Sequence, residues 1–445
     1  MSACNNKESA EKIRQEILAK VKEYYQLTHA NKSFIPGQSK ISYAGRVYDD
    51  QEMSAMVNSV LDFWLTLGKE DQQFTKDFSQ FTGLKKTLLV NSGSSANLIA
   101  ITALKSPLLE NRLLDGDEII TPAVTFPTTL APIIQNNLIP VLVDCDEGTY
   151  NLRVSELQKA YSAKTRGVFV PHTLGNPADI AAIYDFAQER GLYLIEDCCD
   201  ALGAEFNGQK AGTFGDIATF SFYPAHHITM GEGGATATDN TTLYRAMLSL
   251  RDWGRDCFCP WDQNDAMGAC GRRFDWKIEG LSEGYDHRYI YSHIGYNLKP
   301  LDIQAAMAIQ QLKKLPDFIR RRNQNFNQLY QGLSGYQDFL ALPTTYSKAA
   351  PAWFAFPIMV KPQAAFSRHD LVRFLEERQI QTRRLFAGNI LKQPGYKNIR
   401  CRVIGDLAVT NQVMERVFFV GVYPGLNNQM IDYMLAQFGE FIKRG

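Results

Sequence analysis

Closely spaced cysteines are the residues of this chain whose type and spacing point most directly to chemistry. Of eight cysteines, Cys257 and Cys259 stand one residue apart, Cys270 follows, and Cys198 and Cys199 are adjacent. The polar, charged N-terminus predicts no secretory signal, so we expect a reducing compartment, in which clustered cysteines indicate metal or redox work. Four thiolates suit an iron–sulfur cluster or structural zinc. The one-residue gap is tighter than zinc sites prefer, which favours the cluster.

A second group of residues predicts a site for a phosphorylated ligand. Gly93, Ser94 and Ser95 follow a β-rich run and open a helical one. In that setting backbone N–H groups and the helix dipole bind phosphate, although a ligand-free helix start of small residues has the same pattern. Ser221 offers a hydroxyl either to a phosphate or to a neighbouring strand.

Three further residues have types that suit a pyridine cofactor. Asp197 ends the run LYLIED, where a carboxylate pairs with a protonated ring nitrogen or caps the next turn. Phe126 follows another strand-like run, where its ring stacks on a ligand or packs in the core. His226 is suited to moving protons near neutral pH, or to a packed structural role such as we expect for its neighbour His227. The residues alone leave these alternatives open.

Alternating elements are expected to position these side chains. Between about residues 85 and 240, β-rich runs alternate with helical patterns, beginning with TLLVNSG and SSANLIAITALK. Such alternation predicts an α/β domain with a mostly parallel sheet covered by helices. Polar residues gather where the runs end, at 91–95, 144–146, 172–176 and 197. Ligands of open α/β sheets bind beyond the carboxyl ends of strands, so we expect one common site there.

The pattern changes on either side of this region. An amphipathic helix is predicted near residues 8–27, and long helices near 301–333, 368–378 and 429–443 flank one strand-like run, WFAFPIMV. We therefore expect residues 1–300 to form an N-terminal helical segment and a large cofactor-binding α/β domain, with a cysteine loop at 251–275. Residues 301–445 are expected to form a smaller C-terminal α+β domain.

Length and charge narrow the classes of protein. At 445 residues, with 47 basic and 47 acidic side chains, the chain is long enough for two cores and has no net charge to attract nucleic acid or an anionic membrane. No stretch approaches the roughly 18 uninterrupted apolar residues of a membrane span. We expect a soluble, cytoplasmic protein that binds neither nucleic acid nor a membrane.

In order and spacing, these motifs resemble the DegT-type sugar aminotransferases, whose fold is aspartate aminotransferase-like (fold type I). The resemblance runs from WLTLG at Trp64 through GSSAN, IEDCCDALGA and GEGG to GYNLKPLDIQAA at 295–306. It implies that the four motifs around residues 93, 126, 197 and 221 bind pyridoxal phosphate or pyridoxamine 5'-phosphate. It also implies that Asn297 reaches the cofactor phosphate of the neighbouring subunit, and hence a homodimer with shared active sites.

One exchange separates this chain from the aminotransferases of that family. In the run SFYPAHHITMGEGG, His226 stands where the resemblance places the cofactor lysine, and no lysine lies between Lys210 and Lys277. A lysine amine can hold pyridoxal phosphate covalently, whereas imidazole can only move protons. The resemblance therefore implies a non-covalent cofactor, pyridoxamine 5'-phosphate, with His226 as the catalytic residue.

Within the family, the cysteines resemble those of the CDP-4-keto-6-deoxyglucose 3-dehydratases, whose 2Fe-2S motif is C-x57-C-x-C-x7-C. Here 57 residues separate Cys199 from Cys257, and Cys259 follows, so the resemblance selects Cys199 rather than Cys198. Cys270 departs from the pattern, because ten residues instead of seven precede it. A three-residue insertion in a loop has a small entropic cost, so the ligand set Cys199, Cys257, Cys259 and Cys270 is retained.

The resemblance implies C3 deoxygenation of a nucleotide-linked 4-keto-6-deoxyhexose, in 3,6-dideoxysugar biosynthesis for lipopolysaccharide O-antigen. His226 would remove a proton, the C3 hydroxyl would leave, and an NADH-dependent flavin or iron–sulfur reductase would supply electrons singly through the cluster. The run TRRLFAGN at 382–389 resembles the family's substrate loop. Arg384 is thus a donor to the substrate diphosphate or an exposed surface arginine.

Two other functions fit parts of the sequence. The first is a cluster-free sugar 3-dehydratase that regenerates its cofactor with glutamate, against which the cysteines argue. The second is a non-catalytic, zinc-bearing protein that binds a sugar nucleotide. The nucleotide (CDP, dTDP or GDP), the sugar stereochemistry and the identity of the reductase stay open, as does cluster retention by the longer Cys259–Cys270 loop.

Overall fold

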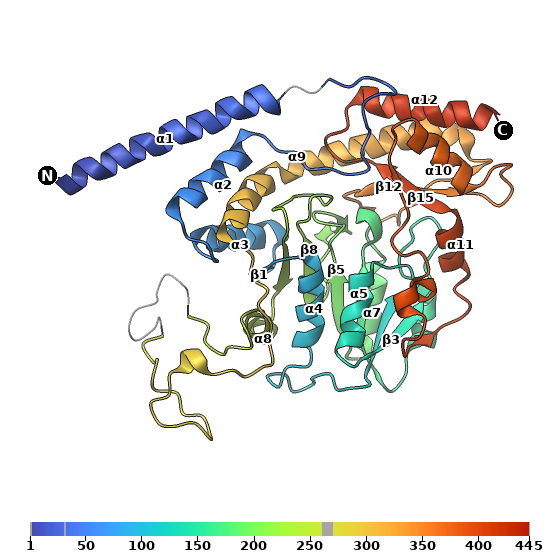
Figure 1. The fold of residues 1–445 in the computed structure, drawn as a ribbon. Helices are drawn as coiled ribbons and strands as arrows, with labels where there is room; N and C mark the ends of the chain where they lie inside the picture. Colours follow the sequence, from blue (N-terminus) through green and yellow to red (C-terminus); the bar gives the residue numbers. More distant parts are fainter. Residues whose placement is uncertain (1, 31–32, 260–269, 445) are drawn as a thin grey trace.

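The computed structural model describes residues 2–30, 33–259 and 270–444 (Figure 1). Residues 260–269 of the expected cysteine loop lie outside the described residues. Among the described residues, no helix combines the length and apolar character needed to cross a membrane.

An eight-stranded mixed sheet forms the centre of the molecule. Its strands, in spatial order, are β1 (Lys86–Val90), β9 (Gly234–Thr238), β8 (Ile217–Ser221), β5 (Tyr193–Asp197), β4 (Thr165–Pro171), β2 (Glu118–Pro122), β3 (Ile139–Val143) and β14 (Arg402–Val403). β9 runs antiparallel to both of its neighbours, and all other pairs are parallel. This confirms the predicted α/β fold with a mostly parallel sheet.

Helices cover both faces of this sheet, as the apolar strand sequences require. Adjacent strand residues point to opposite faces, so Ile119 packs with Ile99 and Leu130 while Ile120 packs with Ile183. The helices involved are α4 (Gly93–Ala103), α5 (Pro127–Gln135), α6 (Leu157–Ala160), α7 (Ile180–Glu189) and α8 (Thr241–Arg251). A separate three-stranded sheet of β11 (Ala349–Ala350), β6 (Glu205–Phe206) and β7 (Gln209–Lys210) lies outside the main sheet.

The C-terminal part forms a smaller α+β unit, as predicted. Its four-stranded sheet has the order β10 (Leu340–Ala341), β12 (Ala355–Val360), β15 (Val417–Gly421) and β13 (Thr382–Arg383), flanked by α10 (Arg368–Glu377) and α12 (Asn428–Arg444). The long helix α9 (Asp302–Leu333) connects the two units, because Leu312 packs in the large core and Leu329 in the small one. Ile41, far earlier in the chain, also packs in the small core. The predicted division at residues 300 and 301 stays a prediction.

The N-terminal helix packs on its neighbour but keeps large apolar side chains exposed to solvent. α1 (Ser2–Thr28) confirms the helix predicted at residues 8–27 and packs along α2 (Asp50–Asp62), which precedes α3 (Lys69–Thr82). Arg14 of α1 pairs with Asp62 of α2 at 2.6 Å. Ile13 and Tyr24 on the predicted apolar face of α1 are nevertheless each 55% exposed.

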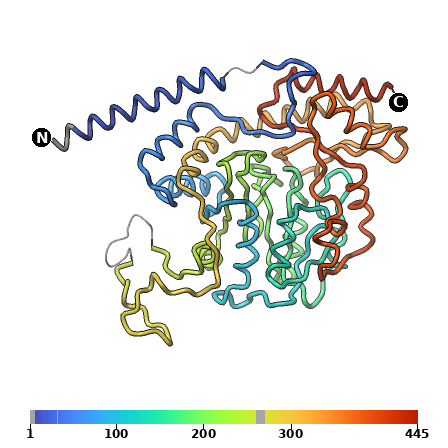
Figure 2. The backbone as a smooth tube through the Cα atoms, in the orientation of Figure 1, coloured from blue at the N-terminus to red at the C-terminus, as the bar shows by residue number. Residues whose placement is uncertain are grey.

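Residues 252–259 and 270–297, here called the arm, leave the body after α8 and project from it (Figure 2). Its two strands of chain are paired near the base, where Arg255 forms an antiparallel bridge with Tyr291. The arm returns to the body at Asn297, just before α9 begins.

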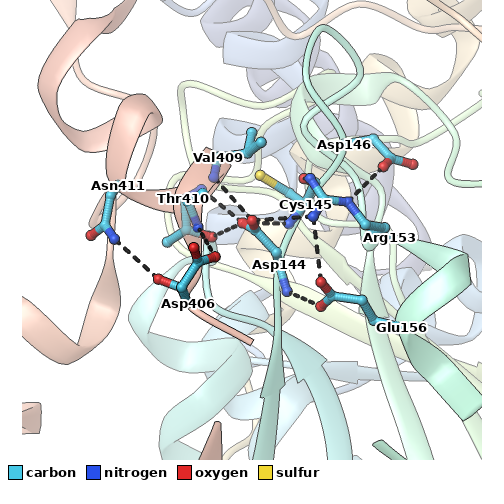
Figure 3. Close-up of polar contacts among 10 residues, drawn as sticks. Asp144, Cys145, Asp146, Arg153, Glu156, Asp406, Val409, Thr410 and Asn411 are labelled. Atoms are coloured by element: carbon cyan, nitrogen blue, oxygen red, sulfur yellow. Dashed lines mark hydrogen bonds and ion pairs between the residues drawn. The ribbon is translucent and has the colours of Figure 1, made fainter. Parts of the chain in front are cut away.

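A carboxylate joins the large sheet to the small unit. Asp144, at the end of β3, accepts hydrogen bonds from the backbone N–H groups of Val409 and Thr410 and from the Thr410 hydroxyl, at 2.6–2.9 Å (Figure 3). These N–H groups belong to the first turn of α11 (Ala408–Arg416), where helical donors have no intrahelical partner. Arg153 lies 3.3 Å from the same carboxylate. Asp144 therefore acts as a cap that ties α11 to β3.

Candidate active site

A cleft with a volume of about 690 Å³ lies between the carboxyl ends of the sheet strands and the small unit. That volume suits a cofactor together with part of a second ligand. Eight of the predicted site residues line it, namely Gly93, Ser94, Phe126, Asp197, Cys199, Ser221, His226 and Arg384. Ser95, Asn297, Cys257, Cys259 and Cys270 are not among its lining residues.

Asp197 is held in one orientation at the end of β5. One carboxylate oxygen accepts from the Asn97 side chain at 2.9 Å and from the Thr129 hydroxyl at 2.8 Å, and the other accepts from the Cys199 N–H at 3.1 Å. The carboxylate is nearly buried but lines the cleft. The sequence did not predict Asn97 or Thr129, although Asn97 ends the GSSAN motif noted above and Thr129 stands three residues after Phe126.

The start of α4 forms a narrow floor beside Asp197. A side chain at Gly93 would place its Cβ 2.5 Å from the Cβ of Ser221 and 3.0 Å from the sulfur of Cys199, so only glycine fits. The Ser92 hydroxyl accepts from the Ser95 N–H at 3.0 Å, and the Ser95 hydroxyl donates to Asn91. Ser95 therefore belongs to the helix cap, and the backbone donors of Gly93 and Ser94 are those left for a phosphate.

His226 lies on the loop after β8, and the backbone of this loop is bonded to the connecting helix α9. Arg322 of α9 donates to the His226 carbonyl at 2.9 Å. The ring atom Nδ1 lies 3.3 Å from a carboxylate oxygen of Asp200, and the ring centre lies 5.4 Å from that of Phe354. Asp200 stands three residues after Asp197, a spacing that was readable from sequence, whereas nothing local signals Arg322 or Phe354.

His227 is structural, as predicted. It is buried, and its Nε2 atom donates to the Ala352 carbonyl at 2.8 Å. Burial, together with the Arg322 guanidinium, lowers the pKa of His227 well below its ordinary value. Among the described residues that line the cleft there is no lysine, so nothing there offers an amine to hold an aldehyde cofactor covalently.

Aromatic and basic residues line the outer part of the cleft. Phe126 is 51% exposed, so its alternative as a core residue is wrong, and its ring lies 6.2 Å from that of Phe386. Arg384 is exposed and donates to the Met414 carbonyl at 3.3 Å. Arg383 was missed, although it is adjacent and also lines the cleft. Two guanidinium groups at the rim suit an anionic ligand such as a diphosphate.

The structure separates the predicted cluster ligands into two places. Cys257, Cys259 and His287 of the arm have ligand atoms that all lie within 4.8 Å of one another. The sulfur of Cys270 lies 3.2 Å from Nε2 of His287. Cys199, in contrast, lies in the cleft, where burial and the Asp197 carboxylate raise the pKa of its thiol. Three of the four predicted thiol ligands thus lie in the arm. The fourth, Cys199, lies in the cleft and does not join them within one chain.

Asn297 lies at the base of the arm rather than in the cleft of its own chain. It forms an isolated antiparallel bridge with Asp252, and the neighbouring Leu298 carbonyl accepts from the Asn91 N–H at 2.8 Å. Its predicted contact with a cofactor in a neighbouring subunit stays a prediction.

The cleft fits a phosphorylated pyridine. The glycine floor with its two free backbone donors suits the phosphate, the oriented Asp197 carboxylate suits a ring nitrogen, and the exposed Phe126 ring suits a pyridine face. All three features come from different strand ends that the parallel sheet brings together.

Comparisons with known proteins agree with this geometry. The chain is 46% identical to the lipopolysaccharide biosynthesis protein RfbH of Salmonella typhimurium, over 97% of this chain and 99% of the relative. It is 45% identical to a dTDP-4-dehydro-2,6-dideoxy-D-glucose 3-dehydratase of Saccharopolyspora spinosa, over 97% of this chain and 92% of the relative. A solved Escherichia coli GDP-4-keto-6-deoxy-D-mannose-3-dehydratase with bound hydrated PLP superposes with a TM-score of 0.80 at 30% identity, covering 89% of this chain and 98% of that one.

These likenesses extend over both units, so they describe the whole architecture and not an isolated motif. Residues 47–438 match the DegT/DnrJ/EryC1/StrS aminotransferase family, which includes the cleft, the arm and the small unit. The fold is that of the fold-type I, PLP-dependent aminotransferase-like proteins. The chain is therefore a member of the DegT/DnrJ/EryC1/StrS aminotransferase family.

Proposed function

We propose that this chain is a nucleotide-sugar 3-dehydratase that removes the C3 hydroxyl from a nucleotide-linked 4-keto-6-deoxyhexose. The first substrate to test is CDP-4-keto-6-deoxyglucose, as an intermediate of 3,6-dideoxysugar biosynthesis for lipopolysaccharide O-antigen. The names of two relatives that are 46% and 45% identical, one a lipopolysaccharide biosynthesis protein and one a sugar 3-dehydratase, support this class of reaction. We further propose a cytoplasmic homodimer.

The observation that carries the proposal is His226 in a cleft lined by no lysine among the described residues. An aminotransferase needs an amine there to hold and exchange its cofactor, and imidazole cannot replace it. A non-covalent pyridoxamine 5'-phosphate fits the cleft instead. When bound, that cofactor offers an amine to the C4 ketone of the sugar and a ring that takes up electrons from the neighbouring carbon.

The residues of the chain have separate tasks in this proposal. Gly93 and Ser94 bind the cofactor phosphate, and Asp197 holds the ring nitrogen. The Nδ1 atom of His226 lies beside Asp200, which leaves Nε2 as the atom that takes up a proton. Arg384 binds the substrate diphosphate at the rim of the cleft.

Removal of the hydroxyl leaves a product that requires two electrons to become the 3-deoxy sugar. The thiols of the arm, with Cys199, are the residues that would hold a 2Fe-2S cluster, which passes electrons singly. We propose an NADH-dependent flavin or iron–sulfur reductase as the partner that supplies them. The close grouping of Cys257, Cys259 and His287, with the sulfur of Cys270 beside His287, supports a metal centre in the arm.

The test is anaerobic purification followed by iron and sulfide analysis, electron paramagnetic resonance after dithionite, and product analysis with a sugar nucleotide, NADH and a reductase. The expected result is a 2Fe-2S signal that is lost in Cys257→Ser, together with a 3-deoxy product. Zinc in place of iron would contradict the redox step and favour a binding protein. Glutamate-dependent, iron-free turnover would favour the cluster-free dehydratase.

A further inference from the structure

We infer that the cluster site is completed between two subunits: Cys257, Cys259 and Cys270 come from the arm of one chain, and the fourth ligand is Cys199 of the partner subunit. The inference rests on the proposed function, because it concerns the ligands of the cluster proposed there. It makes the metal centre a shared element inside the partner's cofactor cleft.

The arm by itself holds an incomplete thiolate set. The ligand atoms of Cys257 and Cys259 lie within 4.8 Å of each other and of His287, and Cys270 also contacts His287. A 2Fe-2S cluster held by cysteines uses four thiolates. Among the described residues, Cys199 does not belong to this group, because its sulfur lies beside Gly93 on the floor of the cleft.

The base of the arm fixes its direction away from its own cleft. Arg251 donates to the Leu89 carbonyl at 3.1 Å, and the two ring nitrogens of His293 contact the hydroxyls of Ser106 and Ser249 at 2.7 and 2.8 Å. Gly254 has a φ of +84°, and a Cβ there would collide with the His293 carbonyl. Glycine at this position lets the outgoing and returning segments of the arm pack closely against each other at its base.

The outgoing and returning segments of the arm stay paired from its base up to Asp256, the residue before Cys257. The Asp256 N–H donates to the Ile290 carbonyl at 2.9 Å, and the Ser292 hydroxyl donates to the Asp256 carboxylate at 2.8 Å. Cys257 is therefore the next residue of an anchored two-stranded ribbon. Bringing it to Cys199 of the same chain would break this pairing, and the projecting arm is seen well clear of β5 in Figure 1.

Apolar side chains of the arm indicate that another protein surface covers it. Ile294 is 98% exposed, and the large side chains of Trp253, Phe258 and Tyr291 are exposed as well. Several large apolar side chains exposed on one projecting segment are typical of an interface. The occupant is a second copy of this chain, because its cleft presents Cys199, the thiol that the spacing of the resemblance groups with the cysteines of the arm. Cys199 is partly exposed to that cleft and so is open to an approaching ligand.

Subunit complementation tests the inference directly. Cys199→Ser and Cys257→Ser chains carrying two different affinity tags are co-expressed, and the mixed dimer is isolated by tandem purification. If ligands come from two subunits, one of its two sites joins an intact arm to an intact Cys199, while the other site lacks both. The mixed dimer is then expected to hold half of the wild-type iron and sulfide, with a 2Fe-2S signal after dithionite. Both homodimeric variants are expected to hold none.

Each other outcome has a distinct meaning. Wild type with iron and a mixed dimer without iron would overturn the shared site and leave the proposed function intact, because the four ligands would then belong to one chain. A Cys199→Ser homodimer that retains its cluster would also overturn it, by making His287 the fourth ligand. Absence of iron from the wild type would overturn the redox part of the proposed function as well. Thermal unfolding and pyridoxal phosphate absorbance of each variant show that the subunits are folded.

Discussion

The cofactor cleft and the arm differ in where their functional groups find partners. In the cleft, the Asp197 carboxylate is held by Asn97 and Thr129 of the same chain. In the arm, thiols are gathered but incomplete, and Ile294 is 98% exposed. The contrast shows that one chain orients the cleft carboxylate by itself, whereas the metal site that we propose needs a second molecule. Substitutions in the two regions should therefore have separable effects.

The sharpest separation is expected from Cys259→Ser in the arm. Loss of one thiolate should abolish cluster binding, because the ligand set already contains no spare thiol within the arm. Iron content and the reduced-state signal should fall to background, while pyridoxal phosphate binding and the unfolding midpoint stay at wild-type values. Cys401→Ser, in the C-terminal part of the chain and outside the proposed ligand set, is the matched control and should keep its iron. Loss of cofactor binding in Cys259→Ser would mean that the two regions are not independent.

The second largest effect is expected from His226→Asn in the cleft. Removal of the imidazole that takes up a proton should lower kcat by about 1000-fold. Cofactor binding, followed by absorbance, and iron content should be retained, because His226 binds neither group in the proposal. His369→Asn, an exposed histidine on α10, is the control. A kcat within tenfold of wild type would exclude His226 as the proton acceptor.

Ile294→Asp tests whether the arm is an interface. A charge in place of an apolar side chain that the proposed dimer would bury should raise the Kd of the dimer about 100-fold, measured by sedimentation at several concentrations. Leu114→Asp, a 58% exposed leucine on the large unit, should leave the Kd unchanged. Equal dimerisation of both variants would show that the arm is exposed in the assembled protein, which would remove the physical basis for shared ligands.

Asp144→Asn tests the hydrogen bonds that tie α11 of the small unit to the end of β3. Burial alone raises the pKa of Asp144, but hydrogen bonds from Thr410 and Val409 outweigh it, so the pKa lies below its ordinary value. The carboxylate therefore stabilises the fold above the unfolded-state pKa of about 4, and this contribution is lost as the pH falls through the lower folded pKa. The variant should lose about 2 kcal/mol of unfolding free energy at pH 7 and show a flatter acid limb in urea titrations.

That outcome has its own control. Asp406→Asn, at the same helix start, keeps an oxygen that can accept from the Ala408 N–H, so it should change stability at pH 7 by less than about 0.5 kcal/mol. If Asp144→Asn lost stability equally at pH 7 and pH 3, the pH-dependent part of the argument would be wrong, and packing alone would account for the loss.

The smallest effect is expected from Arg384→Ala at the rim. Loss of a donor to the diphosphate should raise KM about tenfold with little change in kcat, because the interaction is equal in the ground and transition states. Arg373→Ala, an exposed arginine on α10, should leave both constants unchanged. A fall in kcat with unchanged KM would place Arg384 near the reacting atoms instead.

The sequence predicted the site residues best where they follow strands. Gly93, Phe126, Asp197 and Ser221 each stand at the end of a β-rich run, and the parallel sheet brings these ends to one edge. Asp200 and Arg383 were equally readable, since each is close in sequence to a residue already noted. The role of Ser95 stays a prediction: its N–H is bonded to Ser92, and the pattern of a helix start does not say which donors the cap consumes.

Residues from distant segments had no signal in the sequence. Phe354 beside His226, and Thr410 on the Asp144 carboxylate, meet their partners only through the packing of the small unit against the sheet. The division of the cysteines was equally hidden. The family spacing groups Cys199 with the arm thiols, and spacing along a chain does not specify distance in space once an anchored ribbon intervenes.

By itself, therefore, the sequence determined the alternation of strands and helices, the strand ends that carry chemistry and the absence of a lysine in register, because those features depend on local periodicity and residue type. The tertiary structure alone decided which helix donors are free, which small-unit side chains close the cleft, and that Cys199 lies apart from Cys257, Cys259 and Cys270. The physical reason is that these outcomes depend on long-range packing, in which residues far apart in the chain compete for the same space.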